Sequence, residues 1–220
     1  MKNIITLSYI CLALSACELK VTGRPTPQET QTLSGTWMGS CTDASPSRFL
    51  MNSSQVFKSF ALNQDTSDLG DTLSARHNIS AGDTSMSYEI NSYQDRYCSE
   101  LQFTVKVQMQ YDLRPTIDDY DLHNLDFRYE EITLTPITDA VTEAFNWTSF
   151  CGSDTWRTGI PKDISGKSCA GTRFDLDNTW YFSRVRFSAD NKGLYFNLSN
   201  KSDSESYRPY DAGTNMFIRY

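Results

Sequence analysis

Hydrophobic and polar residues alternate with a period of two along most of the chain, and the clearest example is residues 101–111. Apolar side chains fill every second position of this run, and polar side chains fill the positions between them. Because successive side chains of a strand point to opposite faces, the run predicts a long antiparallel strand with one buried and one solvent-facing side. Aromatic and β-branched residues indicate further strands at 33–41, 47–62, 84–93, 126–134, 178–188, 194–198 and 216–220.

The same pattern predicts where strands bend and end. At residues 130–131 the apolar phase slips by one position, which indicates a β-bulge. The sequence Asp-Asn-Lys-Gly at 190–193 lies between two apolar-rich segments and is the strongest hairpin signal in the chain. One short helix is expected over 138–145, with Thr138 or Asp139 as its cap.

Long alternating strands joined by turns, with little helix, predict an all-β fold. We expect a single antiparallel up-and-down barrel over residues 33–220, because closure removes the exposed edges that an open sheet would have. A two-sheet β-sandwich is the alternative.

Residues 1–16 differ from the rest of the chain. A short basic start precedes an apolar stretch that is too short to span a bilayer as a stable helix, a pattern typical of a signal peptide. The stretch ends Leu14-Ser15-Ala16-Cys17, and these residues resemble the lipobox of bacterial lipoproteins. The resemblance implies cleavage before Cys17 and lipid chains on its sulfur and amino group. Such chains would anchor the mature protein in a membrane of the bacterial envelope.

Residues 17–32 are expected to be the lipidated cysteine and a polar, proline-containing tether that reaches roughly 20 Å as a coil. Glu18 follows the cysteine, where an aspartate would resemble an inner-membrane retention signal, so the outer membrane is favoured. The chain has a formal net charge of −7, which disfavours nucleic acid as a partner. The membrane contact is therefore assigned to the N-terminal lipid.

Four cysteines lie beyond the signal segment and the lipobox: Cys41, Cys98, Cys151 and Cys169. An even number in an oxidising compartment predicts disulfides, and three pairings are possible. The sequence-near choice joins Cys41 to Cys98 and Cys151 to Cys169, with about 4 and 3 kcal/mol of stabilisation from chain entropy. A zinc site is the alternative, but no C-x-x-C spacing is present, so no metal is expected.

Gly35-Thr36-Trp37 at the start of the domain and Arg219 near the end of the sequence resemble the lipocalin pairing of a Gly-x-Trp motif with a C-terminal arginine. The resemblance implies that Arg219 lies across Trp37 and closes one end of a barrel through a cation–π contact. It covers these four residues, and the cysteine spacing departs from the lipocalin pattern. A core tryptophan with an unrelated surface arginine is the alternative.

A broader resemblance extends along the domain. The stretch from Gly35 to Cys41, the pattern Tyr93-x-Asp95-x-x-Cys98, and Cys151-Gly152 with Trp156 are similar to uncharacterised bacterial lipoproteins. This resemblance implies the same kind of anchored domain and carries no known activity.

Signals of catalysis are weak. Neither His77 nor His123 accompanies a nucleophile motif, and we interpret both as solvated or capping residues. Adjacent Glu130 and Glu131 point to opposite faces of a strand unless a bulge brings them together. The densest acidic run lacks the EF-hand spacing and is interpreted as a solvated loop: Asp118, Asp119, Asp121 and Asp126. No catalytic residue, cofactor or enzymatic activity is therefore expected.

The aromatic content leaves two interpretations open. The chain has 12 Tyr and 12 Phe beside Trp37, Trp147, Trp156 and Trp180. These side chains either fill the barrel or line a mouth that stacks an apolar or sugar-like ligand.

The sequence predicts a lipid-anchored, non-catalytic binding or scaffold module. A protein-binding role is the alternative, as inhibitor or partner of an envelope hydrolase or assembly complex. The loop at 114–124 or the Cys151–Cys169 loop would carry that role.

Overall fold

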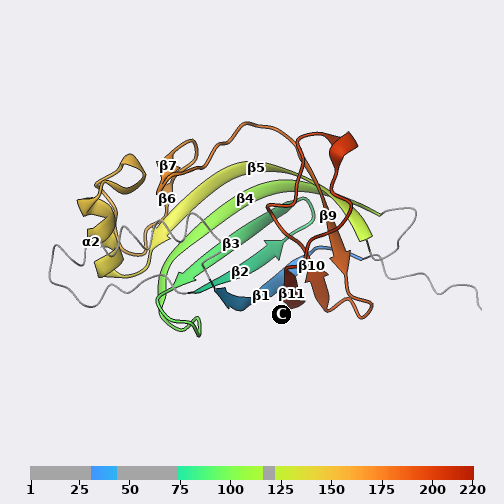
Figure 1. Ribbon diagram of the computed structural model, residues 1–220, viewed down its shortest axis with the longest axis horizontal. Coiled ribbons are helices and arrows are strands. Elements are labelled where there is room, and N and C mark those ends of the chain that lie inside the picture. The colour runs from blue at the N-terminus through green and yellow to red at the C-terminus, as the bar shows by residue number, and fades with distance from the viewer. Residues whose placement is uncertain (1–30, 44–73, 116–121) are drawn as a thin grey trace, which may run out of the picture. The chain divides into compact units, whose positions relative to one another are not determined.

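The computed structural model describes residues 31–43, 74–115 and 122–220 (Figure 1). The predicted signal peptide, Cys17 and most of the tether lie outside these residues. The strand predicted at 47–62 lies outside them too, as do the acidic positions Asp118, Asp119 and Asp121. The described residues from Thr32 onward belong to one compact unit.

The strands form a closed antiparallel barrel, with the order β4-β3-β2-β1-β11-β10-β9-β5 around the ring and pairing of β5 with β4 to close it (Figure 1). The predicted up-and-down barrel is therefore confirmed, and the β-sandwich is excluded. The strands of the ring are β1 (Gly35–Asp43), β2 (Ser74–Ala81), β3 (Ser85–Tyr93), β4 (Leu101–Pro115), β5 (Leu122–Pro136), β9 (Tyr181–Phe187), β10 (Gly193–Tyr195) and β11 (Met216–Arg219).

The longest strand pair, β4 with β5, follows the period-two pattern that predicted it. Apolar side chains on one face of each strand are buried in the barrel. Gln108 pairs with Glu131 and Met109 pairs with Tyr129, so Glu130 is the extra residue on β5. The predicted β-bulge is confirmed at this position.

Some strand boundaries differ from the prediction. The sequence pattern does not predict β2, because Ser74–Ala81 carries few large apolar residues; its pairing with β1 and β3 holds it in the sheet. The start of β5 lies at Leu122 rather than at residue 126, since the chain there pairs with both β4 and β9. β10 ends at Tyr195, and a turn at Asn197 prevents the strand from reaching residue 198.

A small lobe follows β5 outside the ring. The helix α2 (Asp139–Trp147) begins after Thr138, whose side chain accepts a hydrogen bond from the backbone N–H of Val141, so the predicted helix and cap are confirmed. Phe145 on α2 stacks on Phe150, with 4.2 Å between ring centroids, and its ring also contacts Phe103 of β4. The lobe contains η1 (Phe150–Gly152), β6 (Lys162–Asp163), β7 (Ser168–Cys169) and β8 (Thr172–Arg173).

Two disulfides pin the chain, and both are the predicted sequence-near pairs. Cys41–Cys98 joins β1 to the turn between β3 and β4. Cys151–Cys169 joins η1 to β7 within the lobe. The disulfide prediction is confirmed, and these four cysteines do not form the alternative zinc site.

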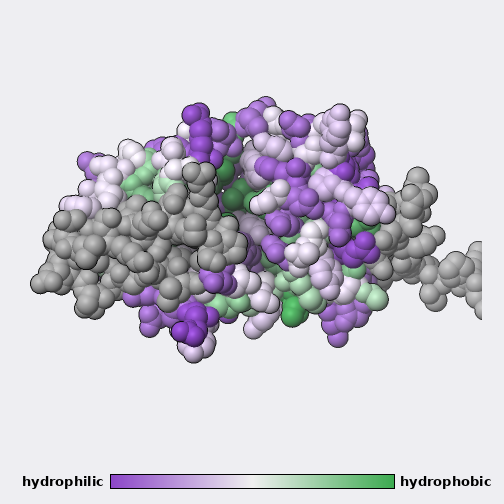
Figure 2. All heavy atoms as spheres, viewed as in Figure 1, coloured by the Kyte–Doolittle hydropathy of each residue, from purple (hydrophilic) through white to green (hydrophobic). Residues whose placement is uncertain are grey.

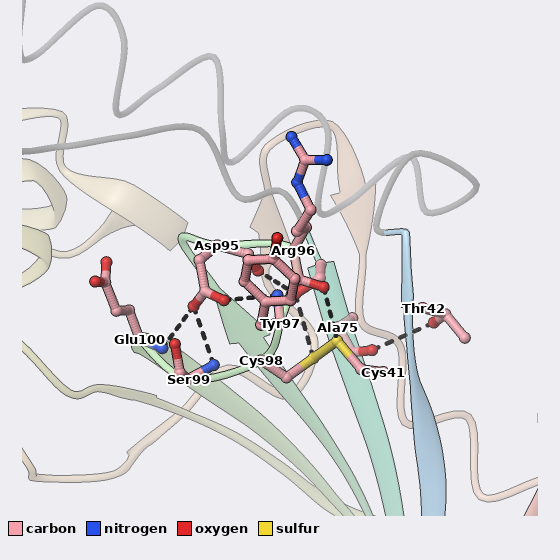
Figure 3. Close-up of a disulfide and its surroundings, with 10 residues drawn as sticks. Cys41, Thr42, Ala75, Asp95, Arg96, Tyr97, Cys98, Ser99 and Glu100 are labelled. Carbon is pink, nitrogen blue, oxygen red and sulfur yellow. Dashed lines mark hydrogen bonds between the residues drawn. A yellow bond between two sulfur atoms is a disulfide. The ribbon is translucent and has the colours of Figure 1, made fainter.

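The turn that carries Cys98 is held by one carboxylate (Figure 3). Asp95 accepts hydrogen bonds from the backbone N–H groups of Tyr97, Ser99 and Glu100 at 2.6, 3.0 and 2.7 Å. Desolvation raises the pKa of Asp95, but these hydrogen bonds outweigh it, so the pKa lies below its usual value. The charged carboxylate therefore orders the turn and positions Cys98 for its disulfide.

A side chain of the last strand lies over a buried tryptophan of the first strand. Trp37 is fully buried, and its Nε1 donates a hydrogen bond to the Leu33 carbonyl at 2.8 Å. The guanidinium carbon of Arg219 lies 5.1 Å from the centre of the Trp37 ring, and Arg219 donates a hydrogen bond to the Ser34 carbonyl. Trp37 and Arg219 are also partners in the pairing of β1 with β11. The cation–π contact joins the first strand of the barrel to its last.

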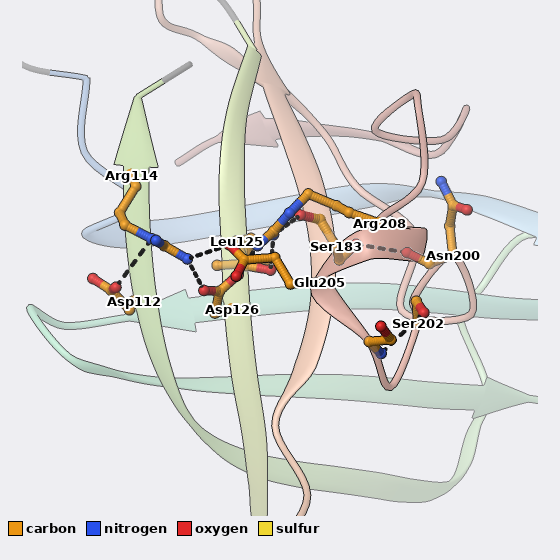
Figure 4. Close-up of polar contacts among 10 residues, drawn as sticks. Asp112, Arg114, Leu125, Asp126, Ser183, Asn200, Ser202, Glu205 and Arg208 are labelled. Carbon is orange, nitrogen blue, oxygen red and sulfur yellow. Dashed lines mark hydrogen bonds and ion pairs between the residues drawn. The ribbon is translucent and has the colours of Figure 1, made fainter. Parts of the chain in front are cut away.

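A buried ion pair fastens the segment between β10 and β11 to the outer wall of the barrel (Figure 4). Arg208 follows η2 (Glu205–Tyr207), and its side chain is only 6% exposed. Its guanidinium lies 2.6 Å from the Asp126 carboxylate of β5 and donates a hydrogen bond to the Ser183 carbonyl of β9. Arg114 of β4 binds the other oxygen of Asp126. This network links β4, β5 and β9 to the η2 segment.

Replacing Arg208 by methionine is expected to lower the free energy of unfolding by about 2–4 kcal/mol, because Asp126 would lose one of its two cationic partners inside the wall. Denaturation by urea measures this loss. The control is Arg173→Met, which removes an equal charge from an exposed pair with Asp175 and should change stability little. Equal effects of the two substitutions would contradict the structural role of Arg208.

Candidate ligand-binding site

Aromatic rings line the inner face of the barrel from β11 across to β5. The ring of Phe217 lies 6.2 Å from that of Tyr88, and Tyr88 lies 6.0 Å from Phe196. Phe196 in turn lies 6.4 Å from Phe127, with the rings perpendicular. These four side chains are buried and come from strands or segments far apart in the sequence, so barrel closure brings them together.

Lys201 extends its ammonium group to the end of this row of rings. Its Nζ lies 3.5 Å from the centre of the Tyr181 ring, 4.2 Å from that of Tyr129 and 5.9 Å from that of Phe127. The ammonium also donates a hydrogen bond of 2.6 Å to the Tyr129 hydroxyl. The next residue, Ser202, forms an isolated bridge with β9, which fixes the backbone at this point. We call Lys201, Phe127, Tyr129 and Tyr181 the lysine cage.

Burial controls the electrostatics of the lysine cage. Desolvation lowers the pKa of Lys201 to about 8, while the nearby Asp177 carboxylate partly opposes that shift. Burial also raises the pKa of Tyr129. The pKa of Tyr181 rises to about 12 through burial and through its hydrogen bond to Asp177, at 2.6 Å. Near neutral pH the cage therefore holds a cation and two protonated phenols.

No ion pair of Lys201 is present within the part of the chain that the structure describes. A partly desolvated ammonium that makes no direct ion pair is a costly group to place against a protein interior. Lysines with lowered pKa values are found at functional sites, where burial adjusts their charge. The lysine cage is therefore the best candidate for a functional site.

The surface of the barrel has hollows. Figure 2 shows a hollow near the middle of one face, with hydrophobic residues at its floor. A cavity of about 280 Å³ lies near the end of β1 and the start of β11, with Thr42, His77, Asn215 and Phe217 in its lining. His77 Nδ1 lies 2.9 Å from the hydroxyl of Tyr88, which belongs to the row of rings. This cavity thus borders the aromatic interior.

Both histidines lie in strands, so their interpretation as solvated or capping residues is wrong. His77 is half-buried on β2, where it shares the inward face with Ala75 and Ile79, and burial lowers its pKa. His123 is buried on β5, and its ring lies edge-on to Phe187 at 5.2 Å. The two-residue alternation of strands β2 and β5 determines where these two side chains point.

Among the described residues, the structure does not gather the candidate acidic side chains into one site. Glu130 and Glu131 are exposed at the bulge of β5. Asp126 belongs to the buried ion pair with Arg208 rather than to a solvated loop, so that interpretation is wrong for this residue. Within the described ranges, no group of three or more His, Cys, Asp or Glu side chains is placed to hold a metal ion.

The four tryptophans differ in exposure. Trp37 and Trp156 are buried, whereas Trp147 is 50% exposed and Trp180 is 38% exposed. None of the four lies in the lysine cage, where phenylalanine and tyrosine provide the rings. The tryptophan content alone was therefore a poor guide to the site.

The sequence does not predict Lys201 as a site residue, because the polar segment around it carries no motif. Tyr129 and Tyr181 have a usable signal, since both occupy the inward phase of predicted strands. Which polar residue enters the barrel between them depends on the path of residues 196–215, and the sequence does not specify that path.

A scan against protein-family models finds no match, and no curated protein matches the sequence. No helix among the described residues is long and apolar enough to cross a membrane. The fold and the lysine cage therefore define the protein by class: an antiparallel barrel whose aromatic interior holds a desolvated cation.

The free energy of unfolding should show the cost of burying Lys201. Its pKa is about 8 in the folded protein against a usual 10.5, so between these values the unfolded chain binds more protons and stability rises with pH. Relative to Lys201→Met, the wild type should gain roughly 1 kcal/mol from pH 8 to 10, because the ammonium retains some contact with water.

Urea denaturation of both proteins across this pH range measures the difference. Lys162→Met is the matched control, since Lys162 also lies over an aromatic ring, that of Trp156, but is far less desolvated. Parallel pH profiles for wild type and Lys201→Met would contradict the desolvation of Lys201.

Proposed function

We propose that the protein is a lipid-anchored, non-catalytic binding module of the bacterial envelope, held in the outer membrane by Cys17. In this proposal its barrel takes up a small apolar or sugar-like ligand at the lysine cage. The lysine cage is the observation that carries the proposal. The lipobox resemblance of Leu14-Ser15-Ala16-Cys17 supports the anchor.

The composition of the cage favours binding over a purely structural role. A filled structural core is best made from aliphatic and phenylalanine side chains, which leave no polar group to satisfy. Here a lysine and two tyrosines occupy inward positions and are only partly buried, so their polar atoms stay within reach of a ligand. Aromatic faces with a few convergent polar groups are the usual lining of a small-molecule site.

The anchor is tested by labelling cells with an alkyne fatty acid. Full-length protein should take up the label and sediment with membranes, and Cys17→Ala should lose both properties. Cys11→Ala, which removes a cysteine from the apolar signal segment, should keep both. Labelling of the Cys17→Ala protein would contradict the lipoprotein assignment.

The binding role is tested by native mass spectrometry of the protein purified from its own membranes. We expect a small molecule bound in a one-to-one ratio, and at least a tenfold lower occupancy in Tyr181→Ala, which removes one face of the cage. Tyr207→Ala is the control, because Tyr207 is 80% exposed and lies outside the barrel. Absence of any adduct, or equal adducts in all three proteins, would contradict the proposal.

A protein partner is the second candidate. It is favoured by the disulfide-stapled lobe, which exposes Trp147 at 50% and Ile160 at 56%. Exposed large apolar side chains on a rigid lobe are typical of an interaction surface. In this case Trp147→Ser with Ile160→Ser should remove a co-purifying envelope protein, and Tyr181→Ala should retain it.

A further inference from the structure

We propose that the ligand of the barrel carries an anionic group, which Lys201 binds together with the Tyr129 hydroxyl. This inference rests on the proposed binding function and names the chemical class of the ligand. It is carried by the positions of the polar atoms around the lysine cage.

Lys201 has hydrogen-bond donors that no described residue uses. An ammonium group has three N–H donors, and one of them serves the Tyr129 hydroxyl at 2.6 Å. The ring faces of Tyr181 and Tyr129 stabilise the charge but accept no strong hydrogen bond. An anion at this point would receive charge-assisted hydrogen bonds and would form the direct ion pair that Lys201 does not make with any described residue.

Tyr129 supplies a second donor at the same point. Its oxygen accepts from Lys201, and its own hydroxyl hydrogen meets no acceptor among the described residues. Because burial raises the pKa of Tyr129, the phenol remains a donor. Tyr181 differs, since its hydroxyl already donates to Asp177. The anion site is thus formed by Lys201 and Tyr129, and the ammonium of Lys201 lies over the ring face of Tyr181.

Three carboxylates act on Tyr181 of the cage, those of Asp177, Asp203 and Asp175, and Asp177 also acts on Lys201, so a ligand must tolerate their charge. Asp177 is exposed, accepts the Tyr181 hydroxyl at 2.6 Å and accepts the backbone N–H of Thr179 at 3.1 Å. Those bonds hold it on the solvent side of Tyr181, where water screens its charge. Asp177 should therefore weaken anion binding without preventing it.

Cationic and neutral ligands fit the cage less well. The aromatic faces would suit a ligand cation, but the ammonium of Lys201 already lies 3.5 Å from the centre of the Tyr181 ring and would repel a second positive charge. A neutral ligand would displace water from Lys201 without pairing its charge. An acid with an apolar or aromatic body satisfies both the rings and the ammonium.

The test compares naphthoate with naphthamide, which share an aromatic body and differ in charge. Calorimetric titration of the full lipidated protein, in detergent and at pH 7, measures both dissociation constants against a micelle blank. We expect naphthoate to bind at least tenfold more tightly than naphthamide. Lys201→Met should abolish this preference, whereas Lys162→Met should leave it intact. Asp177→Asn should increase it, because a like charge is removed.

The outcomes separate the ligand class from the binding function. Equal affinity for the two probes in the wild type overturns the anionic ligand and leaves the binding module standing. A preference for naphthoate that survives in Lys201→Met also overturns the inference, because the anion is then bound elsewhere. If neither probe binds, both the anionic ligand and the proposed function are contradicted.

Discussion

Closure of the sheet is the constraint on which the rest of this structure depends. Once β5 pairs with β4 on one side and with β9 on the other, every second residue of each strand must point into the barrel. The strand pairing decides which side chains point inward, so a polar residue at an inward position lies inside the barrel. Tyr88 and Tyr129 are placed in this way, and the rings that surround Lys201 follow from the same rule.

Because the barrel must stay closed, contacts outside the sheet are needed to hold its weakest strands in place. The ring contains a very short strand, β10 (Gly193–Tyr195), and the chain after it leaves the sheet before returning as β11. The buried pair of Arg208 with Asp126 holds the segment between β10 and β11 against β5, and Lys201 of the same segment lies over the Tyr181 ring. Arg219 across Trp37 and the Cys41–Cys98 bridge secure the two ends of β1. Stability is concentrated around the wall, while the interior carries a group that lowers it.

Much of the fold was predictable from the sequence because it depends on local pattern. The alternation of residues 101–111 identifies β4, the phase slip identifies the bulge at Glu130, and the sequence-near choice among three possible cysteine pairings is the one observed. β2 was not predictable, because its alternation is weak and its place in the sheet comes from its neighbours. The site was predictable only in part. Period two indicates that Tyr129 points inward, but Lys201 reaches the barrel through an irregular segment whose path is set by tertiary contacts.

The lysine cage is, on this account, a ligand site rather than a structural core filled by the protein's own side chains. A crystal structure of the protein purified from its native membranes tests this most directly. It should show density for a bound molecule whose oxygen lies within hydrogen-bond distance of both Lys201 Nζ and the Tyr129 hydroxyl. A cage filled completely by the protein's own side chains, with a carboxylate of the chain paired to Lys201, would contradict it.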